Sequence, residues 1–122
     1  MIGRLNTTAM DCPQPRQTAR FYQALLGGTL TPEEEDADWI DLDDPSGRRI
    51  LSFQRAEDYV APTWPDNSVP LQMHIDIRVA GYDESEPTIF AAGGRLLDDS
   101  DEHPNFRVYA DPIGRPFCLV LS

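Results

Sequence analysis

The sequence predicts an α+β fold made of two tandem copies of a βαβββ unit, whose strands form a curved, barrel-like mixed sheet around a cavity. One observation is a repeated turn, because residues 44–48 read DPSGR and residues 111–115 read DPIGR. A second is that a helical pattern ends in Gly-Gly in both halves, at residues 27–28 and 93–94. An internal repeat is a stronger signal of architecture than any single local pattern.

The first repeat is expected to span residues 1–56. A first strand is expected at 3–10, and Pro15 suits the first turn of the helix that follows, because its missing N–H costs little there. Four residues recur along that helix at the spacing of one helical face, Thr18, Phe21, Tyr22 and Leu25. Three strands are then expected, at 28–32, 38–43 and 49–55, and the turn at 44–47 joins the last two.

Residues 57–70 are expected to be a linker. The segment is rich in proline and shows no helical or strand periodicity. Trp64 within it is expected to cover an edge of the core, with an entry to the cavity as the alternative.

The second repeat is expected to span residues 71–122. Residues 71–79 alternate between apolar and polar side chains, which predicts a half-buried strand. A helix is expected at about 84–92, where Asp83 and Glu86 have the spacing of a capping box. Three further strands are expected, at 95–99, 105–111 and 115–122.

The charge of the chain limits its partners. The chain has 21 acidic residues, 10 arginines and no lysine, so its net charge is −11. A charge of this sign argues against a nucleic-acid partner and favours a cationic ligand. No apolar run approaches the roughly 18 residues of a membrane span, and the N-terminus lacks a signal-peptide pattern. We therefore expect a cytoplasmic protein that does not bind a membrane, with Cys12 and Cys118 as free thiols.

Three segments, taken in order, resemble the vicinal oxygen chelate superfamily, which includes glyoxalase I, bleomycin-resistance proteins and extradiol dioxygenases. They are DCPQPRQTARFYQALLGG, HIDIRVAGYDESEPTIFAAGGRLL and DPIGRPFCLV, and together they cover both repeats. The nearest group within the superfamily is that of the short glyoxalase-like domains. The resemblance implies the glyoxalase/bleomycin-resistance fold.

The resemblance also implies where a metal would bind, since metal-dependent members carry His or Glu on the first and last strands of each repeat. His74 matches one of these positions, but Cys118 stands where a Glu is usual and Ser52 stands at the equivalent place in the first repeat. The fourth position is Arg4, or Asn6 if the strand has a bulge. We therefore expect no metal site and no cofactor, with a divalent Zn, Ni, Mn or Fe ion as the alternative.

The cavity-facing residues follow from strand alternation. If Met73, Ile75 and Ile77 pack under the helix, the alternate side chains of that strand face the cavity. The predicted ligand-binding residues are Asn6, Thr8, Trp39, Ser52, Gln54, His74, Asp76, Arg78, Tyr109 and Cys118. Asp76 is expected to orient the His74 imidazole or to pair with Arg78.

Three functions remain open from these residues. The first is a module that binds a small cationic or aromatic molecule without metal. The second is a metal-dependent lyase, isomerase or dioxygenase. The third is a metal-free enzyme, with catalytic His74 as general base and Tyr109 or Arg78 stabilising an enolate-like charge. A homodimer is expected by analogy with small members of the superfamily.

Overall fold

The computed structural model describes all 122 residues, which divide into two compact units, an N-terminal unit (Met1–Tyr59) and a C-terminal unit (Val60–Ser122). Each unit contains one βαβββ set, in the predicted order. All strand pairing lies within a unit, so the chain forms two separate four-stranded sheets and no closed barrel. The α+β class and the duplication are confirmed, whereas a cavity shared by both repeats stays a prediction.

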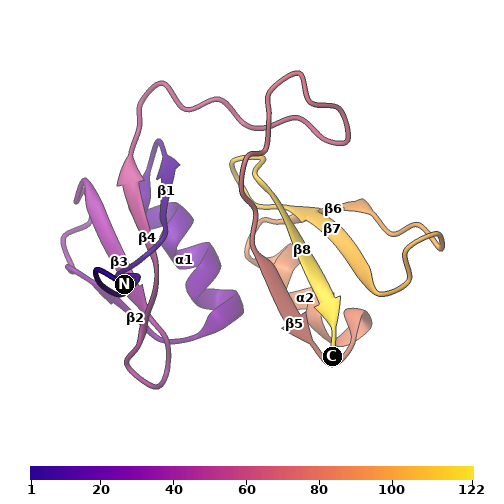
Figure 1. Cartoon of the computed structure of the whole chain (residues 1–122), viewed down its shortest axis with the longest axis horizontal. Helices are drawn as coiled ribbons and strands as arrows, with labels where there is room; N and C mark the ends of the chain where they lie inside the picture. Colours follow the sequence, from indigo (N-terminus) through magenta and orange to yellow (C-terminus); the bar gives the residue numbers. More distant parts are fainter. The chain divides into compact units, whose positions relative to one another are not determined.

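The N-terminal unit has a sheet with the strand order β1-β4-β3-β2. Only β1 and β4 are parallel, and the other neighbours are antiparallel. The helix α1 covers one face of this sheet (Figure 1). The elements are β1 (Ala9–Cys12), α1 (Pro15–Leu26), β2 (Thr29–Thr31), β3 (Trp39–Asp43) and β4 (Arg49–Arg55).

The core of the N-terminal unit lies between α1 and its sheet. Pro15 opens the helix as predicted, and Gly27 ends it with a φ of 75° while its N–H donates to the carbonyl of Gln23. The fully buried Tyr22 ring stacks on Phe53 of β4, with 5.8 Å between ring centroids. The predicted apolar stripe of this helix therefore faces the core.

The C-terminal unit repeats this topology, with the strand order β5-β8-β7-β6 and one parallel pair, β5 and β8. The helix α2 packs against one face through Ile89, which is buried. The elements are β5 (Asp76–Val79), α2 (Tyr82–Ala91), β6 (Arg95–Asp98), β7 (Phe106–Ala110) and β8 (Pro116–Leu121).

Two strands begin later than the sequence pattern predicts. The strand expected at 71–79 covers only Asp76–Val79, and Met73, expected in the core, is 71% exposed. The ladder ends here because the partner strand begins with Pro116, which has no N–H to donate, and because Gln72 has a φ of 61°. The first strand, expected at 3–10, is Ala9–Cys12, and residues 1–6 are exposed.

The helix α2 begins differently from the predicted capping box. Its N-cap is Gly81, without a side-chain cap, and Asp83 lies inside the first turn. The Glu86 carboxylate instead accepts hydrogen bonds from Tyr109 and Arg107 of β7. Of the neighbouring apolar residues Ile89 and Phe90, only Ile89 points to the sheet, and Phe90 is 46% exposed.

The repeated turn has the same internal structure in both units. In the first, the Asp44 carboxylate accepts the backbone N–H groups of Ser46 and Arg48 at 2.9 and 3.0 Å. Asp111 accepts those of Ile113 and Arg115 at 3.0 and 2.9 Å. Hydrogen bonds from the Ser46 side chain and the Arg48 backbone hold the pKa of Asp44 below its usual value. The repeated DP-x-G-R pattern is therefore a structural element and not a binding motif.

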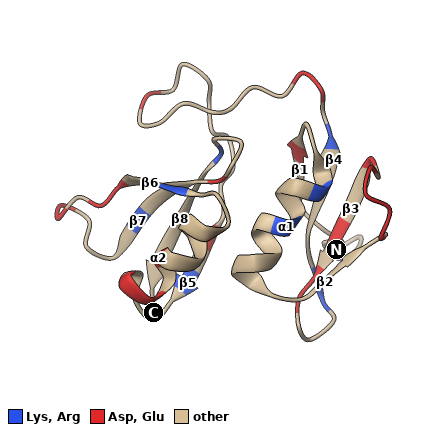
Figure 2. Ribbon diagram, turned by 180° about the vertical axis from the view of Figure 1, so that it is seen from behind, with Lys and Arg blue, Asp and Glu red and all other residues tan.

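Two of the loops between strands are rich in acidic residues. Figure 2 shows acidic residues in the loop between β2 and β3 and in the hairpin between β6 and β7.

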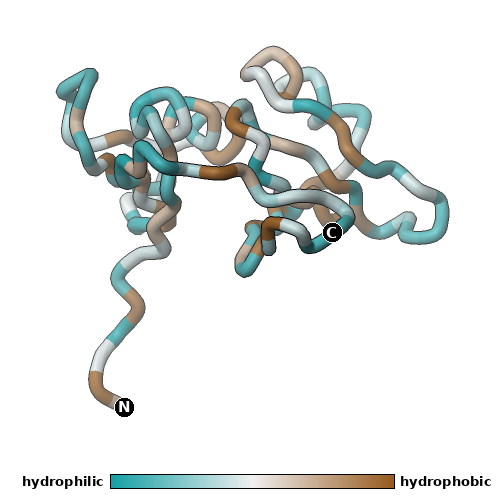
Figure 3. Tube along the Cα trace, turned by 90° about the horizontal axis from the view of Figure 1, so that it is seen from above, coloured by the Kyte–Doolittle hydropathy of each residue, from teal (hydrophilic) through white to brown (hydrophobic).

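Figure 3 shows the N-terminal segment leaving the sheet of its own unit as an extended chain. Neither α1 nor α2 has the length and apolar character that a transmembrane helix requires.

Candidate functional site

A pocket of about 390 Å³ lies in the C-terminal unit. Its walls are mainly apolar, and they come from β7, β8 and the segment that precedes β5. Alternation places Phe106 and Val108 on the face of β7 opposite to Tyr109, which points to α2. The lining residues are Trp64, Leu71, His74, Asp76, Asn105, Phe106, Val108, Pro116, Phe117, Cys118 and Val120.

The predicted linker supplies part of this pocket. Trp64 and Leu71 both line it, and the Trp64 side chain is 39% exposed. A compact turn holds this segment, since the Thr63 hydroxyl accepts the Val69 N–H at 3.0 Å and Thr63 N–H donates to the Val69 carbonyl at 3.0 Å. Trp64 is therefore a wall residue of a pocket in the C-terminal unit, whereas the sequence favoured a role in covering the edge of the core.

Three of the pocket residues, His74, Asp76 and Cys118, form a cluster of nitrogen, oxygen and sulfur atoms. His74 Nε2 is 3.0 Å from Asp76 Oδ1, and Cys118 lies on β8 directly opposite Asp76. The nearest nitrogen, oxygen and sulfur atoms of the three residues are all within 4.8 Å of one another. Burial and the neighbouring Asp76 carboxylate raise the pKa of the Cys118 thiol to about 11, so without a cation it is protonated at neutral pH.

Two other predicted residues of the C-terminal unit lie elsewhere. Tyr109 is fully buried, and its hydroxyl donates to Glu86 of α2 at 2.7 Å. Burial and this hydrogen bond raise the pKa of Tyr109. Arg78 is exposed and does not line the pocket, and the expected partner Asp76 is paired with His74 instead. Neither Tyr109 nor Arg78 is therefore placed beside His74 in this pocket.

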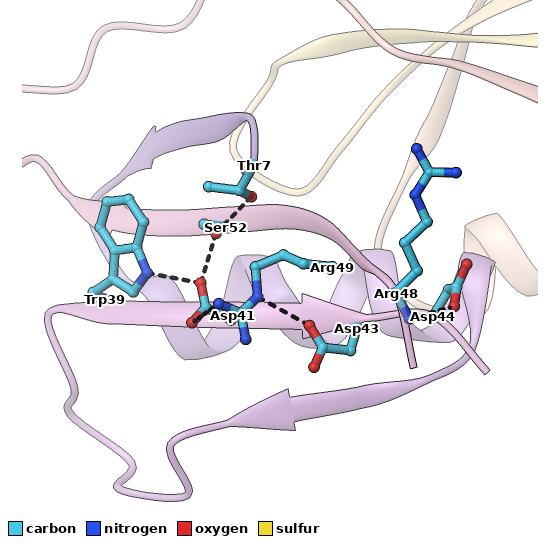
Figure 4. A network of polar contacts seen from close by, with 8 residues as sticks. All are labelled: Thr7, Trp39, Asp41, Asp43, Asp44, Arg48, Arg49 and Ser52. Atoms are coloured by element: carbon cyan, nitrogen blue, oxygen red, sulfur yellow. Dashed lines mark hydrogen bonds and ion pairs between the residues drawn. The ribbon is translucent and has the colours of Figure 1, made fainter. Parts of the chain in front are cut away.

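Two of the predicted residues of the N-terminal unit, Trp39 and Ser52, belong to a polar network on the helix-free face of its sheet (Figure 4). The buried Ser52 hydroxyl donates to Asp41 at 2.6 Å and contacts the Thr7 hydroxyl at 2.8 Å. The Trp39 indole N–H also donates to Asp41, at 2.8 Å, and Arg49 is 3.2 Å from the same carboxylate. The hydroxyl, indole, guanidinium and carboxylate groups of this network bond to one another, and we therefore call it a closed network.

The remaining predicted residues lie at the margins of this network. Gln54 donates to Asp11 at 2.6 Å on the exposed side of the sheet. The Thr8 carbonyl accepts the Ser52 N–H, which fixes Thr8 through its backbone. Asn6 lies in the exposed segment before β1.

The registers of the two units show which residues correspond. Ser52 pairs with Ala9 as Cys118 pairs with Asp76, and the N–H groups of Ser52 and Cys118 bond to the carbonyls of Thr8 and Ile75. Thr7 therefore corresponds to His74, which corrects the expected Arg4 or Asn6. A residue count along the chain cannot locate this position, because the strand starts later than its sequence suggests.

The fit of a metal to these positions differs between the units. The N-terminal unit offers the Thr7 and Ser52 hydroxyls, which are poor metal ligands. The C-terminal unit offers an imidazole, a carboxylate and a thiol. A site with ligands from both repeats is not supported by these residues, whereas a three-residue site in the C-terminal unit has suitable donors.

One wall of the pocket depends on a second histidine. The His103 ring stacks on Phe106 with centroids 4.1 Å apart, and its two nitrogens lie 2.9 Å from the Phe106 carbonyl and 3.1 Å from Asp98. Both partners are acceptors, so only the imidazolium form donates to both. The bond to the Phe106 carbonyl and then the bond to Asp98 raise the pKa of His103. The Ser100 N–H, and then His103, lower that of Asp98.

We expect the stabilisation from His103 to depend on pH. A raised folded-state pKa gives stability that is fully present below the unfolded value of about 6.5 and is lost as the pH rises through the folded value. The Asp98 contribution is lost at the other end, as the pH falls through its lowered pKa. The difference in Tm between the wild type and His103→Gln is therefore expected to be larger at about pH 6 than at about pH 9, and thermal unfolding at the two pH values measures it. A difference that grows toward high pH would contradict the prediction.

The comparisons with known proteins agree with this fold. A family model described as a glyoxalase-like domain matches residues 7–120. The chain is similar to a glyoxalase/bleomycin resistance protein/dioxygenase family enzyme from Burkholderia phytofirmans PsJN, with 16% identity, a TM-score of 0.70 and coverage of 95% of this chain and 96% of that one. No curated protein matches.

Two further solved structures have the same fold. A genomically encoded fosfomycin resistance protein from Listeria monocytogenes is 15% identical, with a TM-score of 0.70 and coverage of 100% of this chain and 95% of that one. A glyoxalase-related enzyme from Fulvimarina pelagi is 19% identical, with a TM-score of 0.66 and coverage of 99% and 89%. At these identities the likeness shows the fold alone.

Proposed function

Since this chain belongs to the family of glyoxalase-like domains, we propose that it binds a small, largely apolar organic molecule in the pocket of the C-terminal unit. The observation that carries the proposal is the pocket itself, whose mainly apolar walls include the His74–Asp76 pair. Pockets of this size with few polar groups are typical of small-molecule sites.

The walls and the charge indicate the class of ligand. Trp64 and Phe106 both line the pocket with aromatic side chains. Aromatic rings stack on flat groups, so these two residues favour a planar ligand. Asp76 is the only acidic side chain of the pocket, and no Arg lines it. An aromatic body with a positively charged group directed at Asp76 is therefore the ligand that the pocket supports best.

A second candidate function is metal-free turnover with His74 as general base. The specific observation is the hydrogen bond to Asp76, which fixes the ring orientation and directs one imidazole nitrogen. Turnover of a bound ligand that stops in His74→Gln, with binding retained, would favour this candidate.

The binding proposal can be tested by fluorescence, because the chain has two tryptophans and only Trp64 lines the pocket. In a Trp39→Phe background, N-methylquinolinium is expected to quench Trp64 saturably. It should bind about two- to fivefold more tightly than the neutral naphthol or the anionic naphthoate, which is the scale of a partly exposed charge pair.

Two variants make the titration specific. Asp76→Asn should remove the preference for the cation, and Val120→Phe should weaken binding of all three probes by filling the pocket. Quenching that does not saturate, or that ignores Val120→Phe, would show that the probes do not occupy this pocket.

A further inference from the structure

We propose that this pocket binds a divalent metal ion of the zinc type through His74, Asp76 and Cys118. The three residues offer one nitrogen, one oxygen and one sulfur atom, all within 4.8 Å of one another. All three also line the pocket. The inference goes beyond the proposed function, because a metal can bind here whether or not the organic ligand does.

The donor set selects the class of metal. A thiolate ligand disfavours Mg²⁺, Ca²⁺ and Mn²⁺, which prefer oxygen, whereas Zn²⁺ accepts sulfur, nitrogen and oxygen together. Three protein ligands with one open position are the usual arrangement of a catalytic zinc site. Donor atoms around one tetrahedral zinc lie roughly 3.3–3.8 Å apart, given bonds of about 2.0–2.3 Å. The observed cluster therefore needs only a small contraction.

The backbone already holds two of the three donors side by side. Asp76 and Cys118 are register partners on the parallel strands β5 and β8, and the Cys118 N–H donates to the Ile75 carbonyl at 3.0 Å. The 3.0 Å bond from His74 Nε2 to Asp76 brings the imidazole to the same place. The ligands are therefore brought together by strand pairing and not by chance contact of long side chains.

Charge also favours occupation by a divalent ion. On binding, the Cys118 S–H bond breaks, its proton passes to solvent and the sulfur lone pair forms the bond to the metal. His74 binds as neutral imidazole, with its ring proton on Nδ1. The thiolate and the Asp76 carboxylate then carry two negative charges, which one divalent ion neutralises. A neutral cluster suits a pocket whose other walls are mainly apolar.

The site is confined to one unit. The corresponding residues of the N-terminal unit are Thr7, Ala9 and Ser52. Ala9 has no ligand atom, and the hydroxyls of Thr7 and Ser52 are engaged in the network around Asp41. The metal would thus be held by residues of the C-terminal unit alone. This arrangement differs from the four positions, two from each repeat, that the family resemblance implies.

Cobalt is the probe for the test, because Co²⁺ occupies zinc sites and a cysteine thiolate gives it a near-ultraviolet charge-transfer band. Untagged protein is stripped with a chelator, freed of it, and titrated with CoCl₂. We expect the band to saturate at about one equivalent and to be displaced by ZnCl₂. Cys118→Ser should abolish the band. His74→Gln and Asp76→Asn should each weaken cobalt binding about tenfold or more.

The chain offers a matched control, because it has one other cysteine. Cys12→Ala removes a thiol from the N-terminal unit and should retain the band. Circular dichroism confirms that each variant is folded, and Asp76 is exposed enough for Asp76→Asn to fold.

Two results would overturn the inference. One is a wild-type protein that gives no thiolate band at stoichiometric Co²⁺. The other is a band that survives Cys118→Ser or disappears in Cys12→Ala. The Trp64 titration, repeated with chelator present, keeps the two proposals apart. Organic probes that still bind without metal support the proposed function even if no cobalt site exists.

Discussion

Replacing Glu86 with alanine is expected to lower the free energy of unfolding of the C-terminal unit by about 2–4 kcal/mol. The Glu86 carboxylate lies under the sheet, where it accepts hydrogen bonds from Tyr109 at 2.7 Å and from Arg107 at 2.6 Å. Tyr109 is fully buried, so its hydroxyl has no water to replace the lost acceptor. The Arg107 guanidinium, which also lies 4.4 Å from the Tyr82 ring centre, loses its opposite charge.

The measurement is urea unfolding followed by Trp64 fluorescence in the Trp39→Phe background. Glu84→Ala is the matched control, because Glu84 is an exposed carboxylate on the same helix and should cost less than about 1 kcal/mol. Tyr109→Phe should cost about 1 kcal/mol, since Glu86 keeps Arg107 as a partner. Equal costs for Glu84→Ala and Glu86→Ala would show that the network does not stabilise the unit.

The same network explains one limit of prediction from the sequence. Arg107 and Tyr109 alternate with Phe106 and Val108 along β7, and both sets contain large side chains. The pattern alone does not say which set faces the helix. A shift of the strand register by one residue would move every side chain of β7 to the opposite face of the sheet. The structure decides it through Glu86, whose spacing from Asp83 instead suggested a capping box.

Local chemistry, in contrast, was predictable. Pro15 and Gly27 mark the two ends of α1 because each affects the backbone of its own turn. The repeated turns follow from Asp44 and Asp111, which bond to N–H groups two and four residues further on. Features that depend on a few neighbouring residues can be derived from the sequence without knowledge of the pairing between strands.

The candidate site depends on that pairing, so the sequence predicted it only in part. His74, Asp76 and Cys118 were each expected to face a cavity, but the contact between Cys118 and Asp76 follows from the β5–β8 register. Thr7 was not predicted, since strand β1 starts later than its pattern suggests. Asp41 was also missed, although alternation along β3 places it on the same face as the predicted Trp39. Trp64 was placed in a linker whose path no periodicity defines.

The two units also differ in chemistry despite their shared topology. The helix-free face of the N-terminal sheet carries charged and hydroxyl side chains that bond to one another (Figure 4). The pocket on the corresponding face of the C-terminal sheet has mainly apolar walls, with His74 and Asp76 among its few polar residues. A closed polar network leaves little capacity for a ligand, whereas a mainly apolar pocket with few polar residues retains it. Duplication thus supplied two copies of a scaffold, of which the second carries the candidate site.

Replacing Gly28 with alanine is expected to destabilise the N-terminal unit by about 3 kcal/mol or more. Gly28 has a φ of 93°, and a Cβ at this position would lie 1.9 Å from the Asp43 carbonyl oxygen and 3.0 Å from the Asp44 Cα. Both contacts are with backbone atoms, which cannot rotate away as a flexible side chain can. The start of β2 would have to separate from the end of β3, where Thr29 pairs with Asp43.

Gly47 provides the control that separates strain from collision. Its φ is 88°, close to that of Gly28, but a Cβ there would meet nothing within 4 Å. Gly47→Ala should therefore cost only the left-handed backbone conformation, about 1–2 kcal/mol. Urea unfolding followed by Trp39 fluorescence in a Trp64→Phe background measures both variants in the unit that contains them. If both variants lose the same stability, backbone conformation alone limits these positions, and the close approach of β2 to β3 contributes nothing.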